Sequence, residues 1–171
     1  KRLVIFNTAA FGLPAGTVLP FRLWVVRNLI PLATPLVRGL NAFSYLATRM
    51  ACVTRMPADV SKAYRAPYDS WANRIATLRF VQDIPLSPRD PGHAIVRETA
   101  DRLHLFQDKP ALICWGEKDF VFDAPFLREW ERFLPHAEVV RFPDCGHYVL
   151  EDASDEILPR VRQFLSANPL G

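Results

Sequence analysis

The sequence predicts an α/β fold in which a sheet of parallel strands is interrupted by a large helical lid. The C-terminal part of the chain alternates between apolar β-type runs and amphipathic helical runs, which is typical of parallel strands joined by crossover helices. The middle part is rich in proline and mostly helical in its periodicity. The 171 residues, half of them hydrophobic, are enough for one domain with a real core. We therefore expect a core strand within 1–11, the lid over 12–106 and the C-terminal core over 107–171.

The first predicted element is a short buried strand at residues 2–7. This run, RLVIFN, is apolar and β-branched, and it ends at the polar residues Asn7 and Thr8. It is preceded by no initiator Met and by no signal-peptide pattern. We therefore expect these residues to be one piece of a larger protein.

Helical periodicity then predicts a series of lid helices at roughly 20–30, 35–53, 57–65, 69–82 and 92–106. One face of the fourth helix is expected to carry Trp71, Ile75, Leu78 and Val81 or Phe80. Loops such as DIPLSPRDPG separate the pieces. A helical insertion of this length is expected to cover the carboxyl ends of the strands, where open α/β sheets bind their ligands.

Two strand–helix pairs complete the prediction. PALICWG (110–116) is an apolar strand stopped by Gly116, and AEVVRF (137–142) is the next strand. DAPFLREWERFL between them predicts a helix with Asp123 as its N-cap and an inward face of Phe126, Trp130 and Phe133 or Leu134. SDEILPRVRQFL predicts the closing helix.

Composition excludes several classes of protein. The net charge is only +3 and the basic residues are scattered, so we expect no nucleic-acid partner. Three widely spaced cysteines without a CxxC or Cys/His pattern disfavour a disulfide framework and a metal site, and favour a reducing compartment such as the cytoplasm. Arg22, Arg27 and Arg38 interrupt the apolar residues of 18–53, which argues against a membrane span and leaves a role at a membrane surface open.

Two polar residues follow the last two predicted strands, in loops that contain glycine. Asp119 lies in WGEKDF and His147 in DCGHYV. A carboxylate beside an imidazole fixes its tautomer and stabilises the imidazolium that forms when histidine takes a proton. Alone, each residue is more often structural. Together, in this order and at these positions, they predict the acid and base of a nucleophile–histidine–acid triad.

Longer stretches strengthen this prediction through a family resemblance. LICWGEKDFVFD and FPDCGHYVLEDASDEILPRVRQFL resemble the last two strand–helix units of the α/β-hydrolase fold. RLVIFNTAAF is similar to the sixth strand of its haloalkane dehalogenase branch, and YRAPYDSWANRIATLRFVQDIPLSP to the lid of that branch. The lid looks especially like that of the β-lactone decarboxylases of bacterial olefin biosynthesis. The resemblance covers the C-terminal half of the family's domain.

The resemblance implies His147 as the base and Asp119 as the acid. Some dehalogenases place the acid after the sixth strand, where this chain has Asn7, which cannot supply a charge; that strengthens Asp119. Asp123 is the nearest rival, but it falls where a helix N-cap is expected. The family's nucleophile lies upstream of the sixth strand, and no Gly-x-Ser-x-Gly or Gly-x-Asp-x-Gly motif occurs here. Cys145 is better interpreted as a packing residue than as a substitute. The chain alone is therefore expected to lack the covalent chemistry.

The expected function is hydrolase chemistry on a small apolar alkyl halide or β-lactone, with an Asp nucleophile outside this chain and no cofactor. The candidate pocket residues are Phe120, Phe122, Asn7 and Trp24. A serine esterase or epoxide hydrolase on the same fold, and a non-catalytic scaffold remnant, are the alternatives. The expected partners are the substrate and the N-terminal half of the hydrolase domain, and a homo-oligomer or enzyme assembly stays open.

Overall fold

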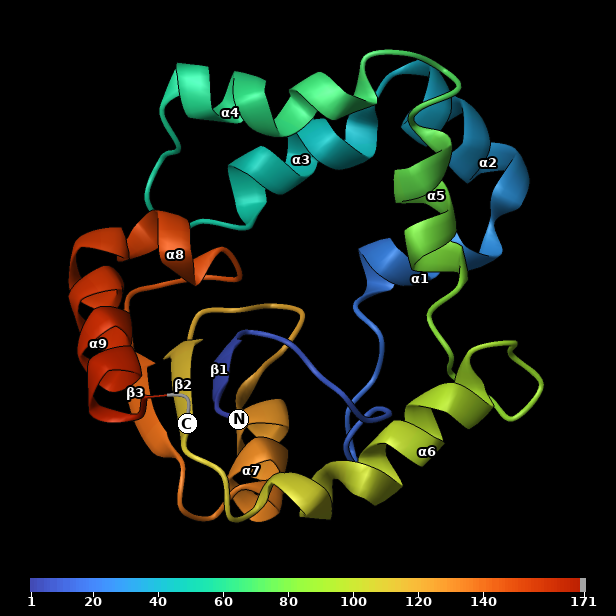
Figure 1. The fold of residues 1–171 in the computed structure, drawn as a ribbon. Helices are drawn as coiled ribbons and strands as arrows, with labels where there is room; N and C mark the ends of the chain where they lie inside the picture. Colours follow the sequence, from blue (N-terminus) through green and yellow to red (C-terminus); the bar gives the residue numbers. More distant parts are fainter. Residues whose placement is uncertain (170–171) are drawn as a thin grey trace.

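A three-stranded parallel sheet forms the base of the structure, a computed structural model that describes residues 1–169. Its strands lie side by side in the order β1 (Leu3–Phe6), β2 (Ala111–Gly116) and β3 (Glu138–Phe142) (Figure 1). Leu3 pairs with Ala111, and Leu112 pairs with Glu138. The parallel sheet that the alternating pattern predicts is thus confirmed.

The segment between β1 and β2 is helical, as predicted. Figure 1 shows α1 to α5 gathered beyond the ends to which the strands point, whereas α6 runs back toward the start of β2. The elements of this lid are α1 (Phe21–Asn28), α2 (Ile30–Thr34), the π-helical turn η1 (Pro35–Gly39), α3 (Ala42–Met50), α4 (Ala58–Arg65), the 3-10 turn η2 (Ala66–Tyr68), α5 (Ile75–Gln82), α6 (His93–Arg102) and the 3-10 turn η3 (Leu103–Phe106).

The single helix predicted at 35–53 is wrong, because Asn41 interrupts it. Asn41 has a left-handed backbone with φ of 55°, which an α-helix cannot contain. Its side-chain amide donates a hydrogen bond to the carbonyl oxygen of Tyr68 at 2.9 Å, so the interruption is tied to another lid segment. On either side stand the π-helical turn η1 and the separate helix α3.

The helix predicted at 69–82 starts later, at Ile75. The side chain of Asn73 donates to Asp69 at 2.8 Å, and such local side-chain bonds compete with the first turns of a helix. Leu78 and Val81 are buried as predicted. Of the two alternatives Val81 and Phe80, it is Val81 that faces inward, and Phe80 is 73% exposed. Trp71, expected on the same face, is instead 50% exposed.

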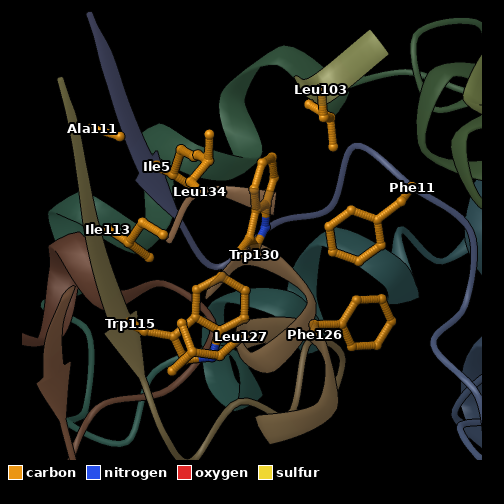
Figure 2. Packing of buried hydrophobic residues seen from close by; sticks show 10 residues of the cluster. All are labelled: Ile5, Phe11, Leu103, Ala111, Ile113, Trp115, Phe126, Leu127, Trp130 and Leu134. Atoms are coloured by element: carbon orange, nitrogen blue, oxygen red, sulfur yellow. The ribbon is translucent and has the colours of Figure 1, made fainter. Parts of the chain in front are cut away.

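The C-terminal elements cover both faces of the sheet with α7 (Ala124–Phe133), α8 (Val149–Asp152) and α9 (Ser154–Ala167). Alternate strand residues point to opposite faces. Ile5, Ile113 and Trp115 pack with α7, in the cluster that Figure 2 shows around Leu127 and Trp130. Leu112 and Cys114 pack on the other face against Ile157 and Phe164 of α9. The inward face predicted for α7 is confirmed, with Phe126, Trp130 and Leu134 buried.

Strand β1 is less buried than predicted. Only Ile5 is fully buried, while Leu3, Val4 and Phe6 are intermediate. In the part of the chain that the structure describes, β1 pairs with β2 alone, so it forms an edge of the sheet. Its end is fixed nonetheless, because the indole N–H of Trp130 donates to the carbonyl oxygen of Thr8 at 2.7 Å.

Candidate active site

The carboxyl ends of the three strands bring a histidine and a carboxylate into contact. His147, in the loop after β3, places its Nδ1 atom 2.8 Å from Oδ2 of Asp119, in the loop after β2. An ionised carboxylate only accepts hydrogen bonds, so Nδ1 is a protonated nitrogen, and Nε2 has a free lone pair when the imidazole is neutral. The carboxylate is fully buried, while the imidazole is 25% exposed. The ring can therefore reach a substrate while its partner stays out of water.

Asp119 is held by partners on both of its oxygens. Oδ1 accepts the backbone N–H of Val121 at 2.7 Å. Oδ2 accepts the side-chain amide of Asn7 at 2.9 Å as well as Nδ1 of His147. A buried carboxylate is tolerated when its oxygens are satisfied in this way. Its orientation, and with it the orientation of the imidazole, is fixed.

Asn7 lies behind the acid, at the end of β1. The side chain is 5% exposed and donates to the carbonyl oxygen of Gly116 at 3.0 Å as well as to Asp119. Its Oδ1 accepts the N–H of Gly116 at 2.7 Å. The amide is thus fully engaged with the loop after β2. Sequence reasoning named Asn7 as a candidate pocket residue and as the residue at the alternative acid position, but missed these bonds, for which its place directly after a strand was the one available signal.

The loops that carry Asp119 and His147 are joined through their backbones. Lys118 donates its N–H to the carbonyl oxygen of Cys145 at 2.9 Å. A Cβ at Gly116 would lie 2.3 Å from the carbonyl oxygen of Gly146, so only glycine permits this approach. Side chains add a surface ion pair between Lys118 and Asp144 at 2.6 Å. The two loops therefore form one unit.

Aromatic rings flank the imidazole. The ring centroid of Phe122 lies 5.6 Å from that of His147. The ring of Tyr148, a residue that sequence reasoning did not select, lies at 5.5 Å. Phe120 is 44% exposed beside the acid loop. Trp24 lies on α1, stacks on Phe21 and is 43% exposed. The structure thus brings Phe122 to the histidine, and the roles of Phe120 and Trp24 in a pocket stay predictions.

The rival residues lie in less suitable environments. Asp123 lies at the predicted N-cap position of α7 with an extended backbone, but its side chain makes no capping hydrogen bond. His147 donates its hydrogen bond to Asp119 instead. Cys145 is buried, and this burial, reinforced by the nearby carboxylates of Asp152, Glu156 and Asp144, raises the pKa of its thiol. A thiol with a raised pKa is a poor nucleophile at neutral pH.

Two surface hollows lie away from the hydrogen-bonded pair. One of about 470 Å³ and one of about 280 Å³ flank the loop after β1, where Gly12 and Leu13 line both. Neither is lined by Asp119 or His147, so the candidate site is marked by the hydrogen-bonded pair and not by either hollow. Residues 1–169 hold no group of three or more His, Cys, Asp or Glu side chains suited to a metal ion. None of the described helices is both long and apolar enough to cross a membrane.

Comparisons with known proteins agree with the observed fold. The sequence profile of the α/β hydrolase fold matches residues 39–154. The chain is 53% identical over 168 residues, 97% of its length, to the cis-3-alkyl-4-alkyloxetan-2-one decarboxylase of Shewanella oneidensis, and covers 52% of that protein. The corresponding protein of Xanthomonas campestris pv. campestris is 48% identical, with 99% of this chain and 56% of that protein covered.

Solved structures show the same fold. The haloalkane dehalogenase DatA of Agrobacterium tumefaciens C58 superposes with a TM-score of 0.81 at 16% identity, with 97% of this chain and 58% of that chain covered. Among proteins compared by sequence, haloalkane dehalogenase 1 of Mycobacterium tuberculosis is 26% identical to this chain over 171 residues, with 97% of this chain and 53% of that protein covered. The chain spans about half the length of the curated relatives that it matches.

Proposed function

Since the chain belongs to the α/β hydrolase fold family, we propose that it supplies the lid, the base and the acid of an enzyme that opens an apolar β-lactone. His147 is the base and Asp119 the acid. The 2.8 Å contact between Nδ1 and Oδ2 is the observation that carries the assignment. The substrate class rests on the two decarboxylase relatives, whose names specify an oxetan-2-one ring with two alkyl substituents.

The roles of the two side chains follow from their geometry. Nε2 of His147 takes a proton from water, and the buried carboxylate of Asp119 stabilises the imidazolium that forms. Water activated in this way hydrolyses a covalent ester between the substrate and an Asp nucleophile supplied from outside these 171 residues. With an alkyl halide as substrate, these steps release a halide ion and then an alcohol.

A β-lactone permits a second fate for the same ester. The nucleophile attacks the saturated ring carbon that bears the ring oxygen, not the carbonyl carbon. This attack breaks the bond between that carbon and the ring oxygen and leaves a free carboxylate on the neighbouring saturated carbon. When this carboxylate departs as CO2, its bonding electron pair forms the C=C bond and the ester C–O bond breaks, which returns the enzyme carboxylate. One lactone gives one alkene and one CO2, and no water is consumed. Apolar side chains such as Phe122 near His147 suit the alkyl substituents.

Replacing His147 by Ala in the full-length protein tests the assignment. We expect hydrolysis of a 1-haloalkane to fall by about 100-fold or more, because the step in which water cleaves the ester needs the base and general acid–base catalysis contributes on that order. With a 1-haloalkane as substrate, the ester should accumulate on the nucleophile and appear as added alkyl mass in intact-protein mass spectrometry. Normal turnover in this variant would remove the catalytic assignment and favour a scaffold.

Product analysis separates the candidate chemistries. A cis-3,4-dialkyl β-lactone should give an alkene and CO2, whereas a haloalkane should give an alcohol and halide if the chemistry of the dehalogenase relative applies. A Ser at the nucleophile position of the full-length protein, with hydrolysis of simple esters, would favour a serine esterase instead. Turnover of epoxides with an Asp nucleophile would favour an epoxide hydrolase.

A further inference from the structure

One carboxylate joins the lid to the loop that carries the histidine. Asp152, at the end of α8, accepts the N–H of Gly146 at 2.8 Å and the N–H of Val53 at 3.0 Å on its Oδ2 atom. Its Oδ1 atom accepts the N–H of Thr54 at 2.8 Å. We call residues 51–54 the lid turn and residues 143–148 the histidine loop. A single side chain thus collects backbone donors from both segments.

The two segments also touch directly. The N–H of Tyr148 donates to the carbonyl oxygen of Ala51 at 2.8 Å. A Cβ at Gly146 would lie 2.7 Å from that same oxygen, a distance that side-chain carbons do not tolerate. The residues immediately before and after His147 are therefore each held against the lid turn.

The charge of Asp152 suits this task. Burial opposes its ionisation, but the hydrogen bonds from Gly146, Val53 and Thr54 outweigh burial and hold the pKa of the carboxyl below its usual value. A carboxylate offers acceptor sites only, so it can satisfy three N–H groups at once. A neutral amide of the same shape has one oxygen and would turn its NH2 group toward at least one backbone donor.

We propose that Asp152 is a positioning residue that sets the placement of His147 by binding the peptide in front of it to the lid turn. The lid and the base then move together: a lid that leaves its docked position releases the histidine loop. This inference rests on the proposed function for the role of His147 as base. Asp119 holds the imidazole ring from the side of the sheet. Asp152 adds a second support for His147, which depends on the lid turn.

The test compares two variants of the full-length protein, Asp152→Asn and Tyr64→Phe. Tyr64 of α4 donates its hydroxyl to Glu151 at 2.7 Å, so it also joins the lid to α8, one residue away from Asp152. Phe keeps the ring that stacks on Tyr148 and has no bond to the backbone of the histidine loop. Tyr64→Phe is therefore the matched control for loss of a lid contact.

Two measurements are expected to separate the variants. Amide hydrogen exchange should rise in both the lid turn and the histidine loop of Asp152→Asn, and in neither segment of Tyr64→Phe. For Asp152→Asn, kcat should fall about 10- to 100-fold with KM within about threefold, because a displaced base slows chemistry more than it weakens substrate binding. For Tyr64→Phe, both constants should stay within about twofold.

The outcomes distinguish this inference from the proposed function. If His147→Ala is inactive but Asp152→Asn behaves like Tyr64→Phe, or if its exchange rises in the lid turn alone, Asp152 only anchors the lid and the inference is wrong. If His147→Ala stays active, the base assignment fails, while hydrogen exchange still reports whether the two segments are coupled. Should Asp152→Asn fail to fold, Gly146→Ala disturbs the same contact from the other side and is expected to give the same exchange pattern.

Discussion

Asp119 is the residue on which the candidate site converges, because strands β1, β2 and β3 each bring one of its neighbours to it. Asn7 follows β1, Val121 belongs to its own loop after β2, and His147 follows β3. A buried carboxylate without such partners would be costly, so each bond contributes to stability as well as to orientation. Changes at single residues around Asp119 should therefore affect both properties.

Replacing Asn7 by Leu is expected to weaken the fold and slow the reaction. The change removes one of the two donors to Oδ2 of Asp119, which keeps its bond from His147, and leaves the N–H of Gly116 without its side-chain acceptor, at a cost of about 1–3 kcal/mol for a buried donor. We expect kcat of the full-length protein to fall by about tenfold as the acid loses its fixed orientation. Urea unfolding and steady-state kinetics measure the two effects. Asn28→Ala, on the exposed surface of α1, is the control, and an unchanged kcat in Asn7→Leu would contradict the prediction.

Replacing Cys145 by Ala is expected to leave turnover within about threefold of the wild type. Its thiol is buried and has a raised pKa, so it contributes packing and not nucleophilic attack. Steady-state kinetics of the full-length protein check this. If turnover of Cys145→Ala fell as far as that of His147→Ala, Cys145 would again be a candidate nucleophile.

At the scale of elements, the sequence was most informative where one strong pattern decides the outcome. Apolar runs closed by glycine predicted β2 correctly, and the amphipathic pattern predicted the inward face of α7. Five lid helices were predicted and α1 to α6 are observed, in roughly the predicted places. Their ends were set by side-chain bonds that periodicity does not encode, as at Asn41 and Asn73. The short helix α8 gave no periodic signal at all.

In the candidate site too, some features could be predicted from the sequence and others could not. Asp119 and His147 could be predicted because each follows a strand, and parallel strands bring their carboxyl ends together. The bonds of Asn7 and Asp152 could not be predicted, because they join residues roughly a hundred positions apart whose proximity only the folded lid and sheet create.

The contribution of Asp152, at the end of α8, to the stability of the protein should depend on pH. The folded pKa of Asp152 lies below the ordinary carboxyl value of about 3.9. Its contribution to stability is therefore complete above that value and is lost as pH falls through the lower folded pKa. The difference in the free energy of unfolding between wild type and Asp152→Asn, measured by urea at pH 7 and about pH 3, should shrink at the lower pH. An equal difference at both values would contradict this.

At the scale of the whole molecule, the sheet separates two clusters of buried side chains, one against α7 and one against α9. The apolar side chains of β1 remain only half buried, because in residues 1–169 this strand has one neighbour. An apolar edge strand is a site for pairing with further chain. The curated relatives are about twice as long as this chain, which suits an additional strand beside β1 in the full-length protein.

Amide hydrogen exchange along β1 tests that expectation. The N–H of Leu3 donates toward β2, to Pro110, and alternate residues of a parallel strand face opposite sides, so the N–H groups of Val4 and Phe6 face the open edge. In the full-length protein these two amides should exchange slowly, and in the isolated 171-residue chain they should exchange quickly. Fast exchange of both in the full-length protein would leave β1 as a true edge.

The position of the lid also has a consequence for how the protein is made. Leu3 and Ala111 are neighbours in the sheet but lie roughly a hundred residues apart in the chain. During synthesis, β1 must therefore wait for the whole lid to leave the ribosome before its partner exists. Contacts of such long range carry a large loop-closure cost and are associated with slow folding. The same insertion that lets a lid touch the histidine thus makes the first strand a late participant in folding and exposes its apolar edge in the meantime.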